Sequence, residues 1–170
     1  QLGDDIDGEA QYDRSGLSVS LSSDGTIVAF SAPWNNGTNR EDSGHVRVYK
    51  LESGSWSQLG PDLDGEEEYD FSGWSVSLSG DGTRLAVGSP FNDGNGNDSG
   101  HVRVYFNSYN NWEQLGEDID GEYRNNLFGT SVSLNKTGDI LAVGAPNNQG
   151  GGTDSGHVRV FEYRTFTNDD

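Results

Sequence analysis

The chain has 170 residues, of which 31% are hydrophobic and 25 are glycine, with neither cysteine nor methionine and a formal net charge of −18 at pH 7. The lack of cysteine excludes disulfides and thiolate metal sites, and the negative charge opposes binding to nucleic acid and to anionic membranes. No segment approaches the ~20 consecutive apolar residues of a membrane-spanning helix. Cations and basic protein surfaces are the partners that electrostatics favours.

The N-terminal part of the chain predicts a β-hairpin. Residues 1–9 are a Gln-Leu-Gly word followed by an acidic run, and residues 18–22 alternate serine with apolar side chains, as a half-buried strand does. Asp24 and Gly25 form a pair that accepts positive φ. Residues 27–32 then return as a second strand.

The segment after this hairpin predicts a loop and two more strands. Residues 34–44 are rich in asparagine, glycine and aspartate, which favours a loop. Residues 45–49 and 55–59 have the composition of strands. Four strands in about 56 residues leave no room for a long helix, so each unit is predicted to be a small antiparallel sheet.

The same sequence pattern occurs three times in the chain. Asp-Ser-Gly-His-Val-Arg-Val begins at Asp42, Asp98 and Asp154, and the repeats span residues 1–57, 58–113 and 114–170. A fixed period of this length predicts stacked units that cannot bury their apolar faces alone. Solenoid coils repeat at about 20–29 residues and propeller blades at about 40–50, so the period favours blades.

The third copy carries a family resemblance. Its order of Phe128-Gly129, residues 131–134, residues 141–146 and residues 156–161 resembles the FG-GAP repeat of integrin-α-type β-propellers, and the pattern covers the whole chain three times. The resemblance implies an all-β propeller of four-stranded antiparallel blades, three of them in this chain. It also implies a non-enzymatic, secreted or cell-surface module for adhesion or protein interaction. The alternatives are a carbohydrate-binding module or an accessory domain of a polysaccharide-active enzyme.

The calcium loop of integrin-type blades does not carry over to this chain. Its place holds only residues 22–26, a turn too tight to supply the 6–8 oxygen ligands of Ca²⁺. Another loop has oxygen side chains at alternate positions and is the candidate Ca²⁺ site, with Asp93, Asn95, Asn97 and Asp98 as ligands. The alternative is that this loop forms Asn-Gly turns without any metal.

The acidic runs that begin at Asp5, Asp62 and Asp118 leave two interpretations open. Carboxylates at this density suggest ligands for hard cations. The apolar residue inside each run, however, favours an inward anchor flanked by solvated acids, and charge runs are usually just exposed.

Each repeat also places a histidine two residues after a serine. This pair resembles a nucleophile and its base, but an active site normally occurs once, whereas this pair occurs in every copy. We expect the histidines to cap the start of a strand. The arginine two residues further lies on the strand face opposite the valines and needs a carboxylate. The expected pairs are Arg47 with Glu9, Arg103 with Glu66 and Arg159 with Glu122.

Positions that differ between copies are where specific binding is expected. Trp34 and Phe91 start equivalent loops and are candidate contacts for a protein or a glycan, with filling of space between blades as the alternative. Three sequons offer N-glycosylation in a secreted protein, at Asn36, Asn97 and Asn135.

The ends of the chain predict an open array. No Gln-Leu-Gly motif follows the third strand of the third repeat, and the position that matches the tryptophans of the other copies is Asn168. The missing word stands at Gln1, which we expect to be a processed end or the edge of a fragment. Three blades are fewer than the 4–8 of ordinary propellers. We therefore expect the N-terminal strand to complete a blade of another copy, such as a ring of two chains, or of a longer parent chain.

Overall fold

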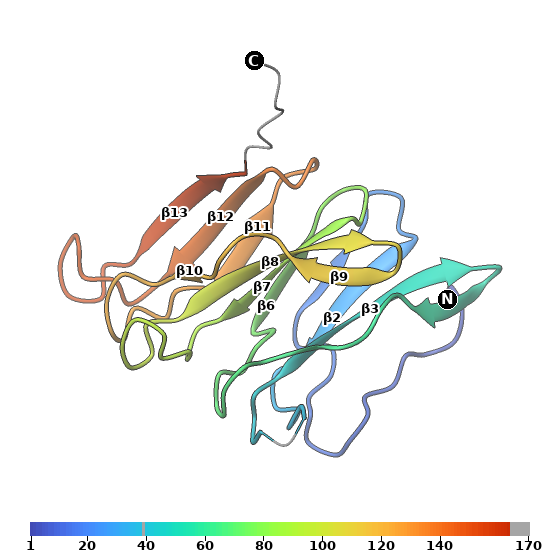
Figure 1. Ribbon diagram of the computed structural model, residues 1–170, viewed down its shortest axis with the longest axis horizontal. Coiled ribbons are helices and arrows are strands. Elements are labelled where there is room, and N and C mark those ends of the chain that lie inside the picture. The colour runs from blue at the N-terminus through green and yellow to red at the C-terminus, as the bar shows by residue number, and fades with distance from the viewer. Residues whose placement is uncertain (39, 164–170) are drawn as a thin grey trace.

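The computed structural model describes residues 1–38 and 40–163, and the regular elements of this part are all β-strands. They form three antiparallel sheets that lie side by side, one for each repeat (Figure 1). The first sheet contains β1 (Val19–Leu21), β2 (Ile27–Ala32), β3 (His45–Glu52), β4 (Ser55–Gln58) and β5 (Leu63–Asp64). The second contains β6 (Ser75–Leu78), β7 (Arg84–Ser89), β8 (His101–Ser108), β9 (Asn111–Gln114) and β10 (Ile119–Asp120). The third contains β11 (Ser131–Leu134), β12 (Ile140–Ala145) and β13 (His157–Glu162).

The predicted hairpin forms, and its turn explains the sequence. Oδ1 of Asp24 accepts hydrogen bonds from Ser22 Oγ at 2.7 Å, from the Thr26 amide at 2.9 Å and from Thr26 Oγ1 at 2.8 Å. These bonds lower the pKa of Asp24 to about 2. The turn itself therefore uses the carboxylate that a calcium loop would offer to the ion.

The fourth strand differs from its prediction because it is split in two. In the first sheet, β4 pairs with the C-terminal half of β3 and β5 pairs with its N-terminal end. Gly60, with a φ of 86°, and Pro61 lie between the two pieces. The second sheet has the same split between β9 and β10, where Gly116, with a φ of 81°, and Glu117 take these places. The glycine with positive φ, and not the proline, is therefore common to both interruptions.

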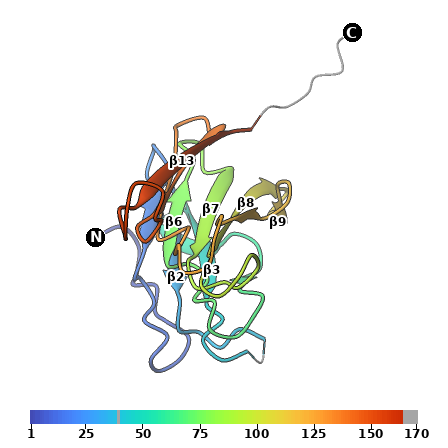
Figure 2. The ribbon, with the colours of Figure 1, turned by 90° about the vertical axis from the view of Figure 1, so that its left-hand side faces the viewer.

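Adjacent sheets are joined along their innermost strands, β1, β6 and β11 (Figure 1). The Val76 amide donates to Ser18 Oγ at 3.0 Å, and the Leu134 amide donates to Ser77 Oγ at 2.9 Å. The serines of the Ser-Val-Ser-Leu motif, which begins at Ser18, Ser75 and Ser131, thus accept hydrogen bonds from the next blade. The loops that follow β2, β7 and β12 lie together at one end of the sheets (Figure 2).

Two apolar layers form the core, one in each space between neighbouring sheets. The first layer packs Val46 and Val48 of β3 with Val76 and Leu78 of β6. The second layer packs side chains of β8 and β12 around Phe128, which is fully buried. The faces at the two ends of the array stay exposed at Val19 (64%) and Leu21 (58%) on β1 and at Val158 (67%) and Val160 (66%) on β13.

The described part of the chain begins beside the first sheet and ends just after β13. Residues 1–18 form no strand. Ile6 and Asp7 have strand counterparts in Leu63–Asp64 and Ile119–Asp120, but within the described residues no preceding sheet is available to pair with them. Asn168, expected at the tryptophan position, lies outside the described residues. Trp112 Nε1 donates to the Leu59 carbonyl at 2.8 Å, and in the third repeat the Tyr163 hydroxyl makes the equivalent bond to Leu115.

Candidate functional site at the loop end of the blades

Each repeat has a cavity at the loop end of its sheet, and the cavity of the second repeat is strongly acidic. It has a volume of about 800 Å³ and is enclosed by residues 66–71 and 91–98. Phe71 and Phe91 provide apolar wall. The carboxylates that line it are Glu66, Glu67, Glu68, Asp70, Asp93, Asp98, Asp118 and Asp120.

The corresponding cavity of the third repeat has a different character. It has a volume of about 480 Å³ and no carboxylate in its lining, which includes Arg124 and Gln149. These two residues stand 56 positions after Glu68 and Asp93. The cavity of the first repeat has a volume of about 790 Å³ and is lined by Asp13, Glu41, Asp42 and Glu68 together with Arg40. The cavity scaffold is therefore repeated, and the second copy carries the most carboxylates.

Burial and mutual repulsion perturb the carboxylates of the acidic cavity. Asp70 is only 3% exposed, and burial raises its pKa although its Oδ2 accepts bonds from Asn92 Nδ2 at 2.9 Å and from the Glu67 amide. Burial also raises the pKa of Asp98, and the charge of Asp93 adds to this effect. Arg103 compensates part of this charge at Glu66 and Asp118, and the other carboxylates leave an excess of negative charge that favours a cationic ligand.

The structure brings together three of the four residues predicted as Ca²⁺ ligands. Asp93, Asn97 and Asp98 line the acidic cavity, and Asp93 Oδ1 accepts the Asp98 amide at 2.9 Å. Asn95 turns away, because its side-chain amide donates to the carbonyls of Gly121 and Glu122. Calcium binding by this loop stays a prediction.

Trp34 and Phe91 belong to one cluster of half-buried aromatic rings at the border of this cavity. Phe71 and Trp74 connect them, with ring centroids 5.3 to 5.7 Å apart along the chain of contacts from Trp34 to Phe91. The guanidinium carbon of Arg14 lies 4.2 Å from the centroid of the Trp34 ring. The repeat pattern did not predict Phe71 as a member of this cluster. Its only signal was an aromatic residue at the position that holds Arg14 and Leu127 in the other copies.

The three sequons lie in different environments. Asn36 and Asn97 are exposed, and Asn36 Oδ1 accepts the Asp42 amide. The amide nitrogen of Asn135 instead donates to Thr137 Oγ1 and Asp139 Oδ1 inside the hairpin turn. A glycan on Asn135 would break these bonds. Glycosylation at all three positions stays a prediction.

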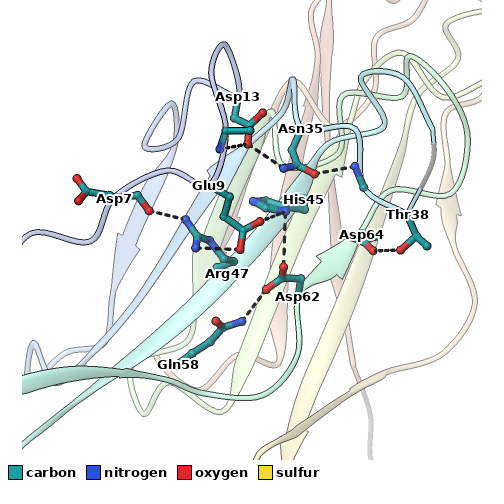
Figure 3. Close-up of polar contacts among 12 residues, drawn as sticks. Asp7, Glu9, Asp13, Asn35, Thr38, His45, Arg47, Gln58, Asp62 and Asp64 are labelled. Carbon is teal, nitrogen blue, oxygen red and sulfur yellow. Dashed lines mark hydrogen bonds and ion pairs between the residues drawn. The ribbon is translucent and has the colours of Figure 1, made fainter.

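A second polar cluster surrounds the histidine at the start of β3 (Figure 3). His45 is buried, and its Nδ1 lies 3.9 Å from Glu9 Oε2 and 3.8 Å from Asp62 Oδ2. Arg47 Nη1 donates to Glu9 Oε1 at 3.3 Å, and its Nη2 donates to the Asp7 carbonyl at 2.8 Å. The sequence did not predict Asp62 in this cluster, because only the pairing of β5 with β3 brings it there.

The expected arginine–glutamate pairs are present in all three repeats. Arg103 contacts Glu66 and binds Asp118 through two hydrogen bonds of 2.9 Å, and Arg159 lies 3.9 Å from Glu122. Each pair joins the third strand of a repeat to the segment that precedes the first strand of the same repeat. Ser43 Oγ is buried without a hydrogen-bond partner, so no bond links it to His45 as a nucleophile to a base.

The comparisons with known proteins agree with this architecture. The family model described as FG-GAP repeat matches residues 63–105, from β5 into β8. The chain resembles the crystal structure of Sqt1 from Saccharomyces cerevisiae, a β-propeller protein. The TM-score is 0.50, the sequence identity is 15%, and the match covers 81% of the present chain. The chain spans 31% of that structure, so the likeness concerns the fold alone. No curated protein sequence matches the chain significantly. Within the described residues no helix is long and apolar enough to cross a membrane.

Proposed function

The chain is a propeller-type repeat protein that contains an FG-GAP repeat, and from this premise we propose that it is a non-enzymatic module for adhesion or protein interaction at the cell surface or outside the cell. Its ligand is a basic segment of a partner protein, bound in the acidic cavity of the second repeat. The observation that carries this proposal is the cavity itself, whose lining combines an excess of carboxylates with Phe71 and Phe91.

Charge and aromatic contacts support a cationic ligand. A cavity lined by one sign of charge concentrates opposite charge, and aromatic faces attract guanidinium and ammonium groups. The contact of Arg14 with Trp34 already shows one guanidinium on this aromatic cluster. A non-enzymatic role is supported by the repetition of the serine, histidine and arginine positions in all three copies.

A glycan ligand has less support from the geometry. Sugars bind on open, flat aromatic faces. Here Phe71 and Trp74 each pack on Phe91 at an interplanar angle of 71°, in an edge-to-face arrangement. The ring faces are therefore used in contacts within the cluster. The carbohydrate alternative therefore stays a prediction that the experiment below also tests.

The proposal is tested with a fluorescent nonapeptide of arginine and lysine, whose binding is followed by anisotropy. The variant Glu68→Gln with Asp93→Gln introduces residues that other copies carry at these positions. We expect about tenfold weaker binding, equivalent to about 1.4 kcal/mol, and a further loss in high salt because of screening.

The matched control removes the same charge elsewhere, with Glu117→Gln and Asp154→Asn, both exposed. It should bind the peptide as the unchanged chain does. Equal losses in both variants would show that only the net charge acts, and would refute the cavity as the site. Binding to an array of neutral glycans without binding to the peptide would favour the carbohydrate alternative instead.

A further inference from the structure

His45 is a buried imidazole that makes no hydrogen bond among the described contacts. Its side chain is 2% exposed and its Nε2 is buried without a partner. Its Nδ1 points at two carboxylates from 3.8 and 3.9 Å, beyond the ~3.2 Å limit of a normal N–H···O bond. Because Nδ1 and the two carboxylate oxygens are too far apart to hydrogen-bond directly, a cation placed between them would contact all three atoms.

The surrounding hydrogen bonds leave three potential ligand atoms free, which are His45 Nδ1, Glu9 Oε2 and Asp62 Oδ2. Arg47 binds Oε1 of Glu9, which leaves Oε2 free, and Gln58 Nε2 binds Oδ1 of Asp62 at 2.6 Å, which leaves Oδ2 free (Figure 3). Together with His45 Nδ1, these atoms lie within 4.8 Å of one another. Carboxylates held from behind in this way are typical of metal ligands.

We propose that Glu9, His45 and Asp62 bind one divalent transition-metal ion of the Zn²⁺ type. In a tetrahedral site with bonds of about 2.1 Å the ligand atoms are about 3.4 Å apart, so an ion would draw the two carboxylate oxygens about 0.4–0.5 Å closer to Nδ1 than the 3.8 and 3.9 Å of the structure. One imidazole nitrogen with two carboxylate oxygens favours Zn²⁺, Co²⁺ or Ni²⁺ over Ca²⁺, which prefers oxygen ligands alone. Glu9 is 46% exposed and gives the ion a path from solvent.

The other two repeats provide internal comparisons. The second repeat contains the equivalent set, Glu66, His101 and Asp118, with ligand atoms also within 4.8 Å of one another. There, however, Arg103 hydrogen-bonds to both carboxylate oxygens of Asp118, so its guanidinium charge competes with a bound cation. In the third repeat His157 Nδ1 lies 4.0 Å from Glu122. The ion is assigned to the first repeat, where hydrogen bonds leave one oxygen of each carboxylate free, with one ion per chain.

The ion also has a structural consequence. Glu9 arrives from the N-terminal segment, His45 starts β3 and Asp62 precedes β5. An ion held by all three would fasten the N-terminal segment and the second half of the fourth strand to the first sheet. Metal binding adds its free energy to folding when the unfolded chain has no preformed site.

The test titrates the full chain with Zn²⁺ by isothermal calorimetry and with Co²⁺ by visible absorption, which reports nitrogen and oxygen coordination. We expect one equivalent of each ion. His45→Gln and Asp62→Asn should each abolish metal binding. Gln58→Leu removes only the hydrogen bond from Gln58 to Asp62 and should weaken metal binding about tenfold. The matched control His157→Gln should bind as the unchanged chain does.

Far-UV circular dichroism shows whether each variant keeps its sheets, and Asp62→Asn provides a second test if His45→Gln does not fold. Absence of Zn²⁺ binding by the unchanged chain at millimolar concentration would overturn the proposal. Binding of one equivalent of ion by both His45→Gln and Asp62→Asn would also overturn it, as would loss of this binding in His157→Gln. None of these outcomes bears on the peptide experiment, since the acidic cavity uses other residues.

Discussion

At the scale of the residue, one position shows how the same hydrogen bonds are made with and without charge. Asp70 accepts bonds from the Glu67 amide and the Asn92 side chain. Its counterpart in the third repeat, Asn126, accepts equivalent bonds from the Tyr123 amide at 3.2 Å and from Asn148 at 3.1 Å. The negative charge of Asp70 is thus unnecessary for the bonds, while its burial makes the charge unfavourable.

Asp70→Asn is therefore expected to raise the melting temperature at pH 7 by a few degrees, given about 2–4 °C per kcal/mol for a chain of this size. Because folding raises the pKa of Asp70, the charged carboxylate destabilises the fold above that pKa. Below 3.8, its ordinary pKa, the group is protonated in both states and the gain should vanish. Thermal melts from pH 3 to 8 check this. The reverse change, Asn126→Asp, should lower the melting temperature at pH 7, and identical melts at every pH would contradict the argument.

At the scale of the element, the repeated Asp-Ser-Gly-His word reflects how a strand begins beside its neighbouring blade. Gly100 has a φ of +74°, and a Cβ there would lie 2.1 Å from the Phe128 carbonyl oxygen. Gly25 in the first hairpin has a similar φ of +72°, with no atom within 4 Å of the same Cβ position. The two glycines thus share their backbone conformation and differ only in their surroundings.

This difference separates backbone strain from a steric clash. Gly25→Ala is expected to cost about 1–2 kcal/mol because an L-residue takes a left-handed conformation. Gly100→Ala should cost clearly more, because the backbone of residue 128 must also move. Urea denaturation of both variants measures the difference. Equal free energies of unfolding would show that the blades are not as tightly apposed as described.

At the scale of the whole molecule, the two open ends of the array are complementary. Val158 and Val160 on β13 correspond to Val102 and Val104, which are buried against the next sheet. Val19 and Leu21 on β1 correspond to Val76 and Leu78, which are buried against the preceding one. Exposed apolar sheet faces favour association, and a head-to-tail contact of two such ends repeats the interface that the chain already makes twice.

We therefore expect the purified chain to associate head to tail, with a ring of two chains and six blades as the simplest closed form. Light scattering over a range of concentrations should show an oligomer. Val158→Asp with Val160→Asp should shift the equilibrium toward the monomer, as should removal of residues 1–7. Tyr109→Ser, which changes an exposed ring on the hairpin of β8 and β9, is the control. A compact monomer under all conditions would refute this expectation.

The sequence by itself determined the architecture of the blades. The alternation in residues 18–22 and the Asp24-Gly25 turn are local features that depend on strand pleat and positive φ, and they predicted the hairpin of β1 and β2. The repeat length of 56 or 57 residues predicted propeller-type blades. The arginine–glutamate pairs were predictable because a buried guanidinium needs a carboxylate that recurs with the same period.

Only the tertiary structure decided which side chains meet across blades. Asp62 joins His45 because the chain turns at Gly60 and returns to β3. Phe71 connects Trp34 to Phe91 because loops of two repeats lie side by side. Such contacts depend on the relative placement of segments more than 16 residues apart, which no local propensity encodes. The sequence therefore identified the residues that differ between copies, and the packing of one blade on the next assembled them into sites.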